Sequence, residues 1–103
     1  MNNVVLNQTY KLLKEMKVVK NESEFGREWL GKSESYMRML RYKNIEASSG
    51  CVAVCGTKLA HYGNRMIETK EYKNLGKRFL ELSERCKELI NRRAEASWLE
   101  EAA

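Results

Sequence analysis

The sequence has 103 residues but no proline and only six glycines. An all-β domain needs many tight turns, which commonly use these two residues, so their scarcity favours an all-α fold. No apolar run approaches the roughly 18 residues that a membrane-spanning helix requires. The first residues also lack the basic stretch and unbroken apolar segment typical of a signal peptide, so we expect a cytoplasmic protein that does not enter a membrane.

Metal-binding residue types are also few, with one histidine, His61, and three cysteines, Cys51, Cys55 and Cys86. Together they could in principle form a Cys3His zinc site. However, Cys51 and Cys55 are one helical turn apart among valines, whereas a structural zinc pair usually lies in a short turn. We therefore predict reduced thiols that act as small core hydrophobes, with redox sensing as the alternative, and no metal or other cofactor.

Groupings of residues that would indicate catalysis are missing from the sequence. It contains no carboxylate pair, no nucleophile and base at a recognisable spacing, and no glycine-rich phosphate-binding loop. We therefore expect neither an enzyme nor a site for a small-molecule ligand.

Positive charge is concentrated in the first part of the chain. The formal net charge is +5, with nine Lys and Arg against five Glu in residues 1–45, but seven of each in residues 71–103. This asymmetry indicates that the first part meets an anionic partner. The alternative is an ordinary solubilising surface.

Apolar residues at helical spacing predict about five helices, over residues 3–17, 22–30, 34–44, 50–62 and 69–99. Asn2 or Asn3 would cap the first helix and Ser33 the third, whose apolar side would carry Tyr36, Met39 and Leu40. The segment 50–62 is also rich in β-branched residues, so a short strand is the alternative there. We expect a single domain with a helical part over residues 1–68 and a long helix over residues 69–103.

Two local signals define the second predicted helix. Asn21 followed by Glu24 forms a capping-box pattern at its start. Gly31 stands where a helix end commonly needs a residue in the left-handed conformation, which glycine adopts at little cost.

Residues 22–41 resemble the helix-turn-helix of phage-repressor-like and other small bacterial regulators. That motif has apolar residues at its fourth, eighth, fifteenth and eighteenth positions, which fall here on Phe25, Trp29, Tyr36 and Met39. The small residue at the fifth position is Gly26. The ninth position is Leu30 rather than glycine, and the glycine follows one residue later. The stretch FGREWLGKSESYM is also similar to short bacterial proteins predicted to carry this motif.

The resemblance implies that the second helix of the pair lies in the major groove of double-stranded DNA. Arg38 would then contact a base, while Glu34 would face a base amine or pair with Arg38. The full set of implied DNA contacts is Lys32, Ser33, Glu34, Ser35, Arg38, Arg41, Tyr42 and Lys43. The alternative is two packed helices of a bundle with a solvated basic face.

The last predicted helix carries an apolar stripe with alternating spacings of three and four residues. This spacing is typical of a coiled-coil seam. It predicts a homodimer, whereas the alternative is packing of the same stripe within the chain. The stripe consists of Tyr72, Leu75, Phe79, Leu82, Cys86 and Leu89.

These observations lead to two hypotheses about function. The first is a sequence-specific DNA-binding protein, a small transcriptional regulator of a bacterium or mobile element that acts as a dimer. The second is a small helical interaction protein, such as an adaptor, antitoxin or inhibitor, whose basic face meets an acidic protein. The salt dependence and sequence preference of DNA binding distinguish the two.

Overall fold

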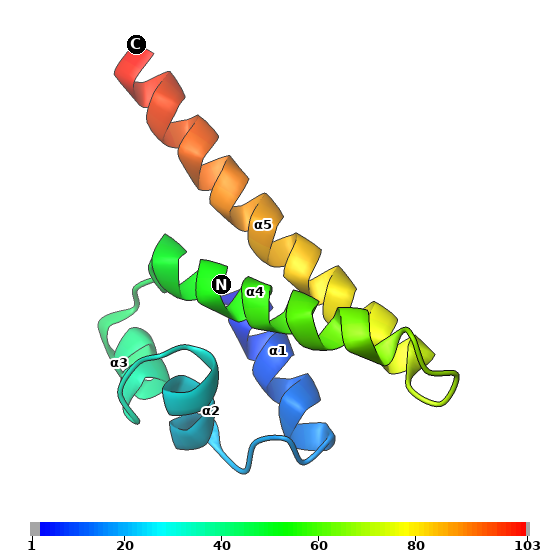
Figure 1. The fold of residues 1–103 in the computed structure, drawn as a ribbon. Coiled ribbons are helices and arrows are strands. Elements are labelled where there is room, and N and C mark those ends of the chain that lie inside the picture. Colours follow the sequence, from blue (N-terminus) through cyan, green and yellow to red (C-terminus); the bar gives the residue numbers. More distant parts are fainter. Residues whose placement is uncertain (1–2, 103) are drawn as a thin grey trace. The chain divides into compact units, whose positions relative to one another are not determined.

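The computed structural model describes residues 3–102, and within this range every regular element is an α-helix (Figure 1). This confirms the predicted all-α fold with five helices and a long last helix. None of the described helices is both long and apolar enough to cross a membrane. The helices are α1 (Val4–Glu15), α2 (Glu22–Trp29), α3 (Tyr36–Lys43), α4 (Ser49–Met66) and α5 (Lys73–Ala102).

The structure resolves the ambiguity in the fourth predicted element in favour of a helix. The segment 50–62 lies inside α4, which has 18 residues and extends further in both directions than the apolar pattern predicted. The last helix begins at Lys73 rather than at residue 69, so Tyr72 precedes it.

The chain forms two compact units, Met1–Cys55 and Gly56–Ala103. We expected the parts to meet between residues 68 and 69, close to the shift in charge. The division instead falls within α4, because the second half of that helix packs with α5.

The first unit has an apolar core formed by α1, α2, α3 and the segments that connect them. Leu13 and Phe25 are fully buried, and Trp29 is 6% exposed. The rings of Tyr10 on α1 and Phe25 on α2 lie 5.5 Å apart and are tilted by 48°. The core aromatics that the sequence pattern placed on α2 are therefore buried as predicted.

Asn3 has a different role from the helix cap that we expected. It precedes α1 with φ of 63°, and its side chain makes no capping hydrogen bond. Its Nδ2 instead donates to the carbonyl oxygen of Ile45 at 3.0 Å, and its Oδ1 accepts from the Ala47 N–H at 2.7 Å. The amide thus joins the start of α1 to the connection between α3 and α4. The alternative cap, Asn2, lies outside the described residues.

The second unit is an antiparallel pair formed by the second half of α4 and α5, and glycines let the two helices approach closely. A Cβ atom built on Gly76 would lie 2.9 Å from the Ile67 nitrogen, and one on Gly63 would lie 2.9 Å from Leu80 Cδ2. Gly56 is equally close to Cys86 Cβ. Each glycine thus makes room for a residue of the facing segment.

Candidate nucleic-acid interface

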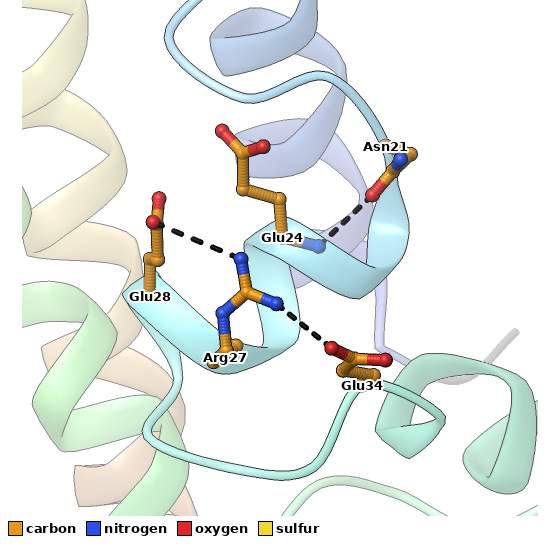
Figure 2. Close-up of polar contacts among 5 residues, drawn as sticks. All are labelled: Asn21, Glu24, Arg27, Glu28 and Glu34. Carbon is orange, nitrogen blue, oxygen red and sulfur yellow. Dashed lines mark hydrogen bonds and ion pairs between the residues drawn. The ribbon is translucent and has the colours of Figure 1, made fainter.

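Local signals set the two ends of α2 as predicted. The Asn21 side chain accepts a hydrogen bond from the Glu24 N–H at 3.0 Å, which satisfies one of the unpaired donors at the helix start (Figure 2). The helix ends at Trp29, and Gly31 has φ of 66°. This left-handed conformation redirects the chain, and the Lys32 N–H then donates to the Gly26 carbonyl oxygen at 2.9 Å.

Gly26 is the point of closest approach between α2 and the segment that leads to α3. A Cβ atom at this position would lie 2.9 Å from the Ser33 carbonyl oxygen and 3.8 Å from Tyr36 Cβ. This explains the small residue at the fifth position of the pattern. The group that crosses most closely is the backbone of the connection, however, rather than the second helix itself.

The connection between α2 and α3 is longer than the pattern predicted. It comprises the six residues from Leu30 to Ser35, whereas a helix-turn-helix commonly has three or four. The prediction that Ser33 caps a helix starting at residue 34 was wrong. Ser35 occupies the cap position without a side-chain capping bond, and the Ser33 carbonyl oxygen accepts from the Tyr36 N–H at 3.2 Å.

The later start of α3 is accompanied by a different buried face from the one predicted. Met37 and Leu40 are buried, whereas Tyr36 and Met39 are half-buried. Met37 was not among the predicted inward residues, because the helix-turn-helix pattern assigns no apolar role to that position. At 100° per residue, the direction opposite the mean of these four residues falls at Arg38.

All eight residues that the resemblance assigns to DNA are exposed. Tyr42 is 90% exposed, and it lies one helical turn after Arg38 on the outward face of α3. Arg41 lies on the other side of Arg38. The eight exposed residues are Lys32, Ser33, Glu34, Ser35, Arg38, Arg41, Tyr42 and Lys43.

A two-pronged ion pair joins α3 to α2. Both terminal nitrogens of Arg41 donate to the Glu22 carboxylate, and the Nη2–Oε1 distance is 2.8 Å. These hydrogen bonds lower the pKa of Glu22 and raise that of Arg41. The charges of Arg38 and Lys14 lower the pKa of Glu22 further. Three cations from α1 and α3 therefore act on the single carboxylate of Glu22.

The second carboxylate near the predicted interface is also paired, although not with the expected partner. Glu34 accepts a hydrogen bond from Arg27 Nη1 at 2.8 Å rather than from Arg38 (Figure 2). Arg27 Nη2 also lies 3.9 Å from Glu28 Oε1. The prediction for Glu34 missed Arg27 because this partner precedes the connection and is brought close only by the turn at Gly31.

The remaining cations are distributed along the connection and α3. Lys32 Nζ lies over the Tyr36 ring, 5.6 Å from its centroid. The Tyr36 ring is half-buried, and burial raises the pKa of its hydroxyl group. Arg38 and Lys43 form no ion pair within residues 3–102. Both side chains are therefore available to an anionic partner.

The six residues of the predicted dimer seam differ in their environments. Tyr72 is exposed and precedes α5, whereas Leu75 and Leu89 are half-buried. Phe79, Leu82 and Cys86 are buried, and Cys86 packs on Gly56 within the second unit. The central part of the seam is thus engaged within the chain.

The candidate metal ligands do not form a cluster. Cys51, Cys55 and Cys86 are buried as free thiols, and His61 is exposed. Among residues 3–102, no three His, Cys, Asp or Glu side chains are grouped as a metal site would require.

The chain belongs to a family of unknown function (DUF6626), whose model matches residues 6–99. This match begins within α1 and ends within α5, so it includes residues of both units and of all five helices. No curated protein and no solved structure matches the chain.

Proposed function

We propose that the protein binds double-stranded DNA through the exposed face of α3 and acts as a small transcriptional regulator. The observation that carries this proposal is the pattern of charge around Arg38. This residue lies at the centre of the outward face, between Arg41 and Tyr42. The two nearby carboxylates, Glu22 and Glu34, each accept hydrogen bonds from an arginine, which reduces their repulsion of phosphate.

Arg38 is the residue that we assign to base recognition. Its planar guanidinium group can donate to both acceptors on the major-groove edge of guanine. Lys32, Lys43 and the Tyr42 hydroxyl group are suited to phosphate contacts, which position a protein on the duplex without specifying a sequence. Ser33 and Ser35 lie just before α3, with their hydroxyl oxygens 3.4 Å apart, and both hydroxyl groups can donate to the phosphates of the DNA backbone.

Dimerisation is part of the proposal, because α3 has only eight residues and spans about 12 Å. One such helix reaches only a few base pairs. Small DNA-binding proteins overcome this by placing two recognition helices about one turn of DNA apart, on a site with two-fold symmetry.

Selection of bound sequences from a random pool of duplex DNA tests the proposal. We expect one preferred sequence, bound with an affinity that falls steeply as salt rises. Arg38→Ala should remove the preference at one base pair, worth about 1–3 kcal/mol, and leave nonspecific binding largely intact. Arg78→Ala, an exposed change in the second unit, is the control. If the pool yields no preferred sequence, or Arg38→Ala alters neither affinity nor preference, α3 does not recognise DNA.

An acidic protein partner is the second candidate for the same surface. The observation that favours it is the strongly exposed Tyr42 beside arginines, since tyrosine and arginine are enriched among the residues that dominate binding energy in protein interfaces. An adaptor, antitoxin or inhibitor would use the surface in this way. Duplex binding without any sequence preference would favour this candidate.

A further inference from the structure

The face of α5 that packs against α4 continues beyond the region of contact. Within the second unit, this face carries Gly76, Leu80 and Ser83, which meet Ile67, Gly63 and Gly56. Steps of three or four residues extend the same face along the helix. The continuation consists of Lys87, Ile90, Ala94, Trp98 and Glu101.

The helix lengths show that α4 does not cover all of this face. The 30 residues of α5 make a helix about 45 Å long, whereas the 18 residues of α4 make one of about 27 Å. Ile90 is half-buried, while Ala94 and Trp98 are exposed, Trp98 by 64%. A large exposed aromatic side chain on the continuation of a packed face is typical of a docking surface.

The residues on this face are arranged so that two antiparallel copies of the face would be complementary to each other. Counted from Ala94, Ile90 and Trp98 lie four residues before and after, and Lys87 and Glu101 lie seven residues before and after. An antiparallel copy with its two-fold axis at Ala94 would therefore place Ile90 against Trp98 and Lys87 against Glu101, each twice. The small Ala94 would lie at the crossing point, where two helices approach most closely.

We propose that this face, defined as Lys87, Ile90, Ala94, Trp98 and Glu101, binds a second copy of the same chain in the antiparallel direction. A parallel pair in register would instead bring Lys87 against Lys87 and Glu101 against Glu101. The charges therefore select the antiparallel arrangement. The resulting contact is isologous, as a two-fold dimer requires. It supplies the dimer that the proposed function needs, but it does not depend on DNA binding.

The first test measures the mass of the intact protein by sedimentation equilibrium, without DNA. We expect a reversible dimer at micromolar concentration, weakened about tenfold or more by Trp98→Ala because the ring is lost from both symmetric contacts. Leu99→Ala is the matched control, since Leu99 is 50% exposed but lies away from this face. Helical circular dichroism of each variant verifies that the chain is folded. A wild-type protein that remains monomeric at all concentrations would overturn the proposal.

Charge reversal tests the direction of pairing. Lys87→Glu should weaken the dimer, because it places glutamate against Glu101 twice, and the double change Lys87→Glu, Glu101→Lys should restore it. In a parallel pair, Lys87→Glu alone would replace one like-charged pair with another and leave the affinity of the dimer unchanged. An unchanged dimer therefore contradicts the antiparallel arrangement. Arg85→Glu makes the same change in net charge on another side of α5 and is the control.

A cysteine introduced at the proposed two-fold axis provides an independent check. Ala94→Cys should form an intermolecular disulfide under mild oxidation, because symmetric residues at a helix crossing bring their Cα atoms within the 4.4–6.8 Å range of disulfides. The native Cys51, Cys55 and Cys86 are buried and should not compete. Ala96→Cys, on another side of the helix, is the control. Equal crosslinking of the two variants would mean that this face is not the interface.

Discussion

The hydroxyl group of Ser83 on α5 donates a hydrogen bond to the carbonyl oxygen of Gly56 on α4, with an Oγ–O distance of 2.7 Å. Ser83 is only 2% exposed, and Gly56 is buried as well. This buried polar contact fixes the relative positions of the two helices more specifically than apolar packing alone. It depends on Gly56, since a side chain there would collide with Cys86.

Ser83→Ala should therefore destabilise the protein by about 1 kcal/mol, the usual net contribution of one hydrogen bond. The loss stays modest because the substitution removes the donor and leaves no buried polar side-chain atom unpaired. Urea denaturation monitored by circular dichroism measures the change. Ser97→Ala, at an exposed position of the same helix, should alter the free energy of unfolding by less than about 0.5 kcal/mol. Equal effects of the two substitutions would show that the buried contact contributes nothing.

Two glycine-to-alanine substitutions should change stability in opposite directions. A methyl group on Gly76 would lie 2.9 Å from the Ile67 backbone nitrogen, which cannot move without shifting the helix. Overpacking of this kind costs about 1–3 kcal/mol, and the gain in helix propensity recovers only part of that cost. No atom lies within 4 Å of the same position at Gly50, near the start of α4. Gly50→Ala should stabilise the protein by about 0.5–1 kcal/mol, as measured by the same denaturation.

The predictions from sequence succeeded where the determining residues are close together in the chain. Asn21 and Glu24 are three residues apart, and Gly31 adopts its left-handed conformation as an individual residue. Helical periodicity likewise defined the burial of Phe25 and Trp29. Each of these features depends on residues within about one helical turn, so the local sequence was sufficient to predict it.

The predictions failed where a side chain bonds to a partner that is distant in the sequence. Asn3 was expected to cap α1, but its amide bonds to Ile45 and Ala47, more than 40 residues away. Arg41 was expected to contact DNA, and its ion pair with Glu22, 19 residues away in the sequence, was not predicted. The pair of Arg41 with Glu22 bridges α2 and α3, so it depends on the connection between these helices, which is longer than the helix-turn-helix pattern predicted.

The two tryptophans should differ in both fluorescence and stability. Trp29 is 6% exposed, whereas Trp98 is 64% exposed. Trp29→Ala should cost about 3–5 kcal/mol, the range for large aromatic side chains removed from a core. Trp98→Ala should cost little in the monomer and leave a blue-shifted emission that acrylamide quenches weakly. Strong quenching of that remaining emission would mean that Trp29 is accessible to solvent.

Stability at acid pH should depend on the pair formed by Glu22 and Arg41. The hydrogen bonds from Arg41 lower the pKa of Glu22 in the folded protein below its ordinary value of 4.5. A lowered pKa means that the pair stabilises the fold above about pH 4.5, and that this contribution is lost as the pH falls through the lower folded value. Glu22→Gln should therefore flatten the pH dependence of the melting temperature between pH 5 and about pH 3. Because the pair is partly exposed, we expect a stability change of no more than about 1 kcal/mol at neutral pH.

The same carboxylate should limit the affinity of the protein for DNA. Glu22 occupies both terminal nitrogens of Arg41 and also acts on Arg38 and Lys14. Glu22→Gln should release Arg41 and remove one negative charge from the surface. We therefore expect tighter nonspecific binding to duplex DNA, with a logarithmic salt dependence steeper by about one unit for the additional phosphate contact. Lys43→Ala should have the opposite effect and reduce the slope by about one unit.

Titration of a fluorescent duplex at several salt concentrations measures both slopes. Glu81→Gln is the matched control for Glu22→Gln, because it makes the same charge change at an exposed position of the second unit. Long-range charge alone would shift both glutamine variants equally, whereas a local interface at α3 requires a larger effect of Glu22→Gln. Equal shifts would therefore assign the attraction to net charge and contradict a DNA contact at Arg41.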